Sequence, residues 1–174
     1  MAHTVDCERA SERPRILVTL GGGDPDNCTS RVLDALALVE ADGAEVRVIC
    51  GPASKHRSTI QRQAQRIPMP IEVLIGVEDM AQPMQWADRC ITAAGSTVWE
   101  YARLGVPMAA GVIAENQVAV AESIERHGMG VNLGWFAHST KEDLSRAFRS
   151  WLFDVDALRH SAGLAAQVVD GQGA

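Results

Sequence analysis

The chain has 174 residues, of which 47% are hydrophobic and 22% are charged, and its formal net charge is −6. This length and composition fit one domain with a full core. The negative charge argues against general binding to nucleic acid or to a membrane surface, although it leaves room for one anionic ligand in a local pocket. The sequence has neither an apolar run that could span a bilayer nor the apolar core of a signal peptide, so we expect a cytoplasmic protein.

The first elements predicted along the chain are a linker, a strand and a glycine-rich turn. Residues 1–14 mix charged and small side chains, and we expect a disordered lead or linker before a domain that spans residues 15–174. Residues 15–20 predict a buried strand that ends at Gly21–Asp24. Three successive glycines let backbone approach a ligand closely, but they also fit an ordinary tight turn. A helix is predicted over residues 29–40.

Two further strands are predicted before the middle of the chain. Residues 45–50 form one and end at Gly51-Pro52; residues 71–75 form the other. The polar, basic segment 54–66 between them predicts a helix whose charges face solvent. A helix is expected over residues 80–87. The cysteines show no metal-ligand spacing, so Cys50 and Cys90 are predicted to be small core residues, and no metal site is expected.

Residues 88–117 are the most informative stretch. Residues 89–93 predict a strand, residues 94–97 a turn, and the following helix ends at Gly105 and Pro107. Residues 106–112 predict another buried strand, followed by Glu115-Asn116-Gln117. Ser96 or Thr97 is expected to cap the helix with its hydroxyl, and Glu100 lies in the first turn, where a negative charge is favourable.

This turn has the composition of a phosphate-binding site. Gly95 permits close approach of backbone, the helix start offers unpaired N–H groups, and the two hydroxyls of Ser96 and Thr97 lie beside them. Glu100 lies one helical turn further on, at the distance of a ribose, whose diol a carboxylate can bind. The alternative interpretation is an ordinary capped helix packed on a sheet.

The rest of the chain predicts a helix over residues 116–127, a short strand over residues 131–133 and two final helices. Trp135 and Phe136 are expected to be exposed or half-buried in the loop that follows the strand. Thr140 and Asp143 have the spacing of a capping box at the start of the next helix. The last helix is predicted over residues 155–169.

Six predicted strands therefore alternate with helices. This pattern is typical of an α/β fold with a doubly wound, Rossmann-like parallel sheet of about six strands and helices on both faces. In such a fold the loops after the first and fourth strands meet at the switch point of the sheet. We therefore expect the segments 21–24 and 95–97 to share one crevice, which favours nucleotide binding.

The stretch resembles the nucleotide-sugar half of inverting two-domain (GT-B) glycosyltransferases of family 28 type. Within that group it is most similar to the UDP-sugar hydrolase of pseudaminic acid biosynthesis and to spore-coat polysaccharide biosynthesis proteins. The resemblance covers roughly residues 15–171 and includes the opening glycines with Asn27. Its most specific part is carried by Gly95, Ser96, Thr97, Glu100, Gly105, Pro107, Asn116 and Gln117.

The resemblance implies a role for each matching residue. Val77 would meet uracil through its backbone, and Glu100 would hold the ribose hydroxyls. Gly95, Ser96 and Thr97 would hold the diphosphate, with Gly22 and Gly23 nearby, and Asn116 and Gln117 would bind the sugar. UDP or a UDP-sugar is the implied ligand, without metal or other cofactor. Glu115 departs from the residue that relatives often carry there, which leaves the identity of the sugar open.

Catalysis by inversion needs a base that activates the incoming hydroxyl or water. In the relatives this base comes from an amino-terminal acceptor domain. We therefore expect the chain alone to be inactive and to need such a domain or a partner subunit. Any peripheral membrane contact would also be made by that missing half. His138 is the nearest candidate base in the chain, and we expect it to be a surface residue. A non-catalytic nucleotide-binding or interaction module is the alternative, and a dinucleotide oxidoreductase is disfavoured because G-x-G-x-x-G is absent.

Overall fold

The computed structural model describes residues 13–169. The lead predicted for residues 1–14 lies outside the described residues except for its last two positions, Arg13 and Pro14. Residues 170–174 also lie outside them.

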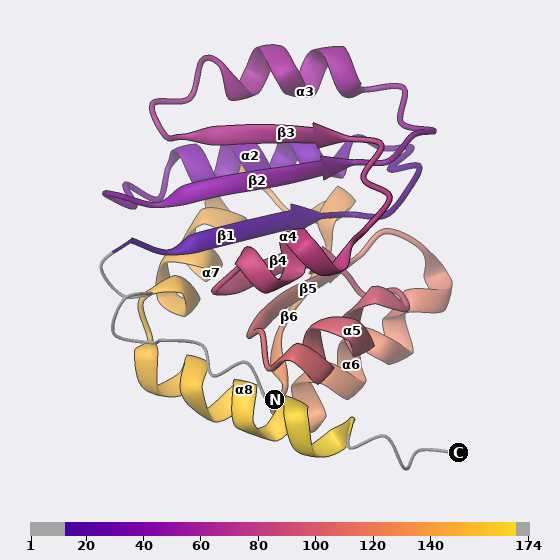
Figure 1. The fold of residues 1–174 in the computed structure, drawn as a ribbon, viewed down its shortest axis with the longest axis vertical. Coiled ribbons are helices and arrows are strands. Elements are labelled where there is room, and N and C mark those ends of the chain that lie inside the picture. The colour runs from indigo at the N-terminus through magenta and orange to yellow at the C-terminus, as the bar shows by residue number, and fades with distance from the viewer. Residues whose placement is uncertain (1–12, 170–174) are drawn as a thin grey trace.

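A six-stranded parallel sheet forms the centre of the molecule (Figure 1). Its order is β3-β2-β1-β4-β5-β6, and every neighbouring pair is parallel. The predicted doubly wound α/β fold is therefore confirmed. The strands are β1 (Arg15–Thr19), β2 (Glu45–Cys50), β3 (Ile71–Ile75), β4 (Arg89–Ala93), β5 (Met108–Val112) and β6 (Gly130–Trp135).

Helices connect the strands, and two more follow the last strand. They are α2 (Cys28–Ala37), α3 (Arg57–Ala64), α4 (Ala81–Trp86), α5 (Thr97–Leu104), α6 (Val118–Arg126), α7 (Lys141–Leu152) and α8 (Val155–Val168), with 3-10 turns η1 (Glu115–Gln117) and η2 (Phe136–His138). The helix predicted over residues 54–66 is shorter because a turn occupies its first residues. No helix within residues 13–169 is both long and apolar enough to cross a membrane.

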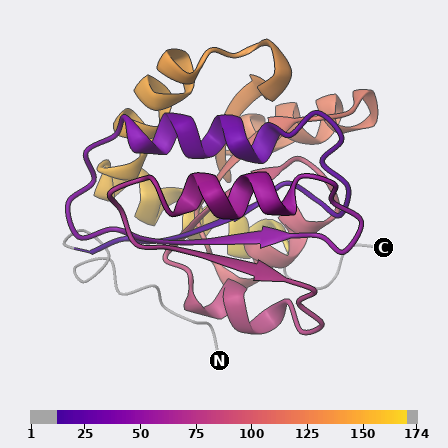
Figure 2. The same ribbon diagram turned by 90° about the horizontal axis from the view of Figure 1, so that it is seen from above.

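The helices cover both faces of the sheet. Figure 2 shows α2 and α3 side by side over one face and α4 on the other. Alternate residues of a strand point to opposite faces, and β1 follows this rule: Ile16 and Val18 pack in one apolar cluster with α2 and α7, whereas Leu17 packs in a second with α5 and α6. Because β1 is buried on both faces, its sequence is continuously apolar rather than alternating.

An ion pair joins the amino-terminal ends of the two central strands. The guanidinium of Arg15 donates to Asp88 at 2.7 Å and 3.1 Å, and the backbone N–H of Arg15 donates to the same carboxylate at 3.0 Å. The backbone N–H of Asp88 returns a bond to the carbonyl oxygen of Arg15 at 2.9 Å. These four bonds set β1 and β4 in a single register at the point where each strand begins.

The packing of η2 corrects one prediction. Phe136 was expected to be exposed or half-buried, but its side chain is 0% exposed and belongs to the cluster under α2 and α7. The ring lies against β5, where a methyl group built on Gly111 would lie 2.8 Å from its Cδ2 atom and closer to its Cε2 and Cζ atoms. Gly111 therefore makes room for Phe136. Gly134 and Trp135 precede Phe136, and this local sequence is typical of a loop, so it gives no sign of the contact with Gly111.

The capping box at α7 is confirmed. The hydroxyl oxygen of Thr140 accepts a hydrogen bond from the backbone N–H of Asp143 at 3.1 Å, and the hydroxyl donates to the Asp143 carboxylate at 2.7 Å. Local signals of this kind depend only on residues three apart, which is why the sequence predicts them well.

We expect Phe136→Ala to lower the free energy of unfolding by about 3–5 kcal/mol, because it removes a fully buried ring and leaves a cavity beside Gly111. Urea denaturation followed by circular dichroism measures this loss. Phe153→Ala is the matched control, since the Phe153 side chain is 47% exposed, and a loss below about 1 kcal/mol is expected there. Equal losses in the two variants would contradict the assignment of Phe136 to the core.

Candidate functional site

The loops after β1 and β4 lie next to each other because these strands are neighbours in the sheet. Thr19, the last residue of β1, is in register with Thr92 near the end of β4. Parallel strands end on the same edge of a sheet, so the glycine loop (residues 21–24) and the Gly95 turn (residues 94–97) leave it side by side. The sequence predicted this juxtaposition from the fold class alone.

A cavity of about 240 Å³ lies at this edge. Among the predicted site residues, Gly22, Val77, Thr97 and Glu100 line it. Four segments far apart in sequence thus contribute to one hollow. Its lining consists of Thr19, Gly21, Gly22, Ile49, Cys50, Gly51, Pro52, Val77, Met80, Thr97 and Glu100.

The glycine loop is held in an unusual backbone conformation. Gly21 has a φ of 87° and Asp24 a φ of 40°, both in the left-handed region that favours glycine. The buried carboxylate of Asp24 accepts hydrogen bonds from the backbone N–H groups of Cys28, at 2.7 Å, and Thr29, at 2.9 Å. Asp24 therefore caps α2 with a negative charge, and the start of this helix is closed to a second anion.

The start of α5 differs from that of α2. Ser96 occupies the position before the helix but its side chain makes no capping hydrogen bond, so the predicted hydroxyl cap is wrong. Its backbone has helical dihedral angles (φ −61°, ψ −27°), whereas a hydroxyl that caps needs an extended residue. Within residues 13–169 the backbone N–H groups of Ser96 and Thr97 have no recorded acceptor. The first turn of α5 therefore presents two N–H donors and two hydroxyls without a carboxylate cap.

Gln117 is oriented toward the Gly95 turn by a bond to its own loop. Its Oε1 atom accepts a hydrogen bond from the backbone N–H of Ile113 at 3.0 Å. The amide nitrogen then points toward the turn, where a methyl group built on Gly95 would lie 3.7 Å from Nε2. Gln117 thus lies beside the turn without lining the cavity. Neighbouring Asn116 is exposed in η1, and Gly23 is exposed in its loop, outside the cavity lining.

Several residues of the cavity wall were not predicted. The end of β2 and the turn after it contribute Ile49, Cys50, Gly51 and Pro52, and the start of α4 contributes Met80. The only signal in the sequence is the Gly51-Pro52 pair at the carboxyl end of a strand, and this pair is equally typical of an ordinary strand end. Burial raises the pKa of the Cys50 thiol, so this residue contributes a protonated, largely apolar group to the wall.

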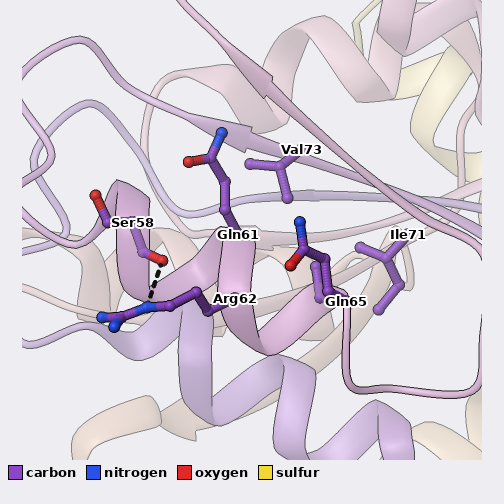
Figure 3. A pocket seen from close by; sticks show the side chains of 7 residues that line it. Ser58, Gln61, Arg62, Gln65, Ile71 and Val73 are labelled. Carbon is purple, nitrogen blue, oxygen red and sulfur yellow. Dashed lines mark hydrogen bonds between the residues drawn. The ribbon is translucent and has the colours of Figure 1, made fainter.

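Other hollows on the surface have a different composition. A larger one of about 630 Å³ lies between α3 and the edge strand β3 (Figure 3). It is lined by Ser58, Gln61, Arg62, Ala64, Gln65, Ile71 and Val73. None of the predicted site residues lines it. Convergent donors from separate loops favour the smaller cavity as the ligand site, in spite of its volume.

The described histidines do not line the cavity. His138 is exposed and stacks on Trp135, with ring centroids 5.6 Å apart, which agrees with a surface residue. His56 contacts the residue that follows the glycine loop, since its Nε2 atom lies 3.1 Å from the carbonyl oxygen of Pro25. Residues 13–169 contain no group of three or more histidine, cysteine, aspartate or glutamate side chains placed to hold a metal ion.

The chain is similar in sequence to proteins of a bacterium and an archaeon. Residues 1–174 include a 120-residue segment that is 32% identical to the spore coat polysaccharide biosynthesis protein SpsG of Bacillus subtilis, covering 68% of this chain and 35% of that protein. A 99-residue segment is 30% identical to an uncharacterised protein of Methanocaldococcus jannaschii, covering 56% and 20% of the two chains. The chain therefore spans about a third or less of these relatives.

Solved structures share the fold. The MurG structure of Acinetobacter baumannii matches with a TM-score of 0.81 and 26% identity, over 98% of this chain and 52% of that one. Anabaena HepE, solved in complex with UDP-glucose, matches with a TM-score of 0.70 and 15% identity over 90% and 44%, which is a likeness of fold.

The family of the chain follows from the match of its sequence together with this fold. Residues 15–153, most of the described domain, match the glycosyltransferase family 28 C-terminal domain. These residues contain all six strands, the glycine loop, the Gly95 turn and the cavity between them. The chain belongs to the glycosyltransferase family 28 C-terminal domain family.

Proposed function

We propose that this domain binds the UDP portion of a UDP-sugar and is the donor half of an inverting glycosyltransferase or UDP-sugar hydrolase. One observation carries the proposal: Gly22, Val77, Thr97 and Glu100, from three separate segments, line a single cavity beside the uncapped start of α5. A nucleoside diphosphate needs an anion site, a diol acceptor and an apolar wall within its own length, and this cavity offers all three.

The diphosphate would lie at the start of α5. The N–H groups of Ser96 and Thr97 and the positive end of the helix dipole favour negative charge there. At the start of α2, which follows the glycine loop, the carboxylate of Asp24 already accepts hydrogen bonds from the backbone N–H groups of Cys28 and Thr29. The contrast between the two helices is the physical reason for assigning the phosphates to α5, with Gly22 facing them from the opposite loop.

The nucleoside would lie along the remaining wall. Glu100 is one turn from Thr97 and supplies two carboxylate oxygens for the ribose diol. Ile49, Pro52 and Met80 give the apolar surface that a planar base prefers, and the backbone of Val77 supplies polar groups at its edge.

The sugar would extend from the diphosphate toward Asn116 and Gln117. Gln117 is favoured for this role because its carbonyl oxygen is used by Ile113, which leaves the amide nitrogen to donate. A second half, fused or separate, would bring the base and the acceptor over the exposed rim. Relatives support this arrangement: MurG is about twice as long as the matched region, and HepE binds UDP-glucose.

The first test concerns Glu100. We expect Glu100→Ala to weaken UDP binding by about 1.5–3 kcal/mol, because hydrogen bonds from the ribose to a charged acceptor are lost. Isothermal titration calorimetry with UDP measures the difference. Glu122→Ala, which removes an exposed glutamate from α6, is the matched control and should bind UDP as the parent does. Equal affinities for Glu100→Ala and the control would remove Glu100 from the site.

The second test concerns the phosphates. We expect Thr97→Ala to weaken UDP binding by roughly 1 kcal/mol or more and to change uridine binding little, because the lost hydroxyl would contact only the diphosphate. The control is Thr59→Ala, an exposed threonine of α3. EDTA should leave UDP affinity unchanged, since N–H groups and hydroxyls hold the anion. A loss of binding in EDTA would show that the cradle requires a metal.

The third test concerns catalysis. We expect the purified chain to release no UDP from UDP-glucose or UDP-N-acetylglucosamine at an enzyme-like rate, because the cavity lining holds no group placed as a base and one open domain does not enclose an acceptor. A chimera with the rest of the SpsG chain should release UDP, and Glu100→Ala or Gln117→Ala should abolish that release. Turnover by the unfused chain, lost in Glu100→Ala, would contradict the need for a second half.

A further inference from the structure

A second turn presses against the glycine loop from the side of β2. The backbone N–H of Ser54 donates to the carbonyl oxygen of Gly51 at 3.1 Å, which closes a four-residue turn over residues 51–54. Pro52 occupies its second position, where a fixed φ stabilises the turn. Gly51 and Ser54, at the two ends of the turn, are buried, whereas its central residues, Pro52 and Ala53, are exposed.

The start of α3 fixes this turn from behind. The Arg57 guanidinium donates to the carbonyl oxygen of Pro52 at 2.6 Å and to that of Ser54 at 3.1 Å. Two bonds from one planar group to two carbonyls hold the turn in a single orientation. The His56 ring contacts Pro25 and so links the same segment to the residue that follows the glycine loop.

The contact between the turn and the loop depends on a missing side chain. A methyl group built on Gly51 would lie 2.6 Å from the carbonyl carbon of Gly22, and closer to its oxygen and Cα. These are backbone atoms, which cannot rotate away as the end of a long side chain would. The backbone of Gly22 therefore rests directly on Gly51, and both residues line the cavity.

We propose that Gly51 is a positioning residue that sets the place of the glycine loop against the diphosphate of a bound nucleotide. The inference rests on the proposed function, because it assumes that Gly22 faces the phosphates. Any side chain at position 51 must push Gly22 away from the turn. The wall near Val77 and Glu100 comes from other segments, so the same substitution leaves that part of the cavity in place. Gly51 thus decides the preference for a nucleoside diphosphate over the nucleoside alone, without itself bonding the phosphates through a side chain.

Titration of Gly51→Ala with UDP and with uridine tests this. We expect the affinity for UDP to fall by about tenfold or more, the effect of losing a hydrogen bond to a charged phosphate, while uridine affinity stays within about threefold of the parent. The ratio of the two affinities is the decisive readout, because a general loss of stability would lower both. An unchanged ratio overturns the inference.

Two further variants keep the test decisive. Gly130→Ala is the matched control: a methyl group there would overlap Met108 of β5, at 2.8 Å from its Cγ, at the opposite edge of the sheet. It should lower stability and leave the ratio unchanged; a ratio that shifts as in Gly51→Ala would mean that any backbone clash has the same effect and would overturn the inference. If Gly51→Ala does not fold, the same titration of Arg57→Ala decides in its place. We expect its ratio of UDP affinity to uridine affinity to be lower than that of the parent. A ratio equal to that of the parent would overturn the proposal.

The proposed function and this inference fail in different ways. A parent chain that does not bind UDP refutes the proposed function, whatever Gly51 does. A parent that binds UDP more tightly than uridine, together with a Gly51→Ala variant that keeps the same preference, refutes only the role of Gly51.

Discussion

The clamp between Arg15 and Asp88 is the interaction on which the rest of the structure depends. It joins β1 and β4 where both strands begin, with bonds of 2.7–3.1 Å between charged groups and backbone. Parallel strands transmit a register along their whole length, so fixing the amino ends also fixes the carboxyl ends of these five-residue strands. The glycine loop and the Gly95 turn face one cavity because of this register. Charges at one edge of the sheet thus determine the geometry of the site at the other.

The starts of α2 and α5 show how similar sequences are used differently. A glycine and a polar residue precede both α2 and α5, and each could be interpreted as a capped helix or as an anion site. At α2 the chain supplies the anion itself, through Asp24. At α5 it supplies none, and Ser96 has the backbone of a helical residue. The difference lies in dihedral angles and in the path of the preceding loop, which the sequence does not reveal.

Much of the fold and part of the site could be predicted from the sequence. Strands, helix ends and the capping box at Thr140 depend on neighbours in the chain, and the switch point follows from topology, which placed Thr97 beside Gly22. The missed features are contacts between segments distant in sequence. Phe136 is buried because Gly111 of another strand makes room for it, and Gly51 belongs to the cavity because β2 ends beside β1. Neither partner can be identified from local pattern.

The charges around the cavity have a consequence for affinity. Among the described residues that line it, Glu100 is charged and none is a lysine or arginine. A bound diphosphate would therefore be held by N–H groups, hydroxyls and the dipole of α5, equivalent to roughly half a positive charge. Such a site binds an anion weakly in open solvent and more strongly when water is excluded, because the local dielectric falls. Closure by a second half would thus raise affinity as well as complete the site, which explains how an acidic chain could serve an anionic donor.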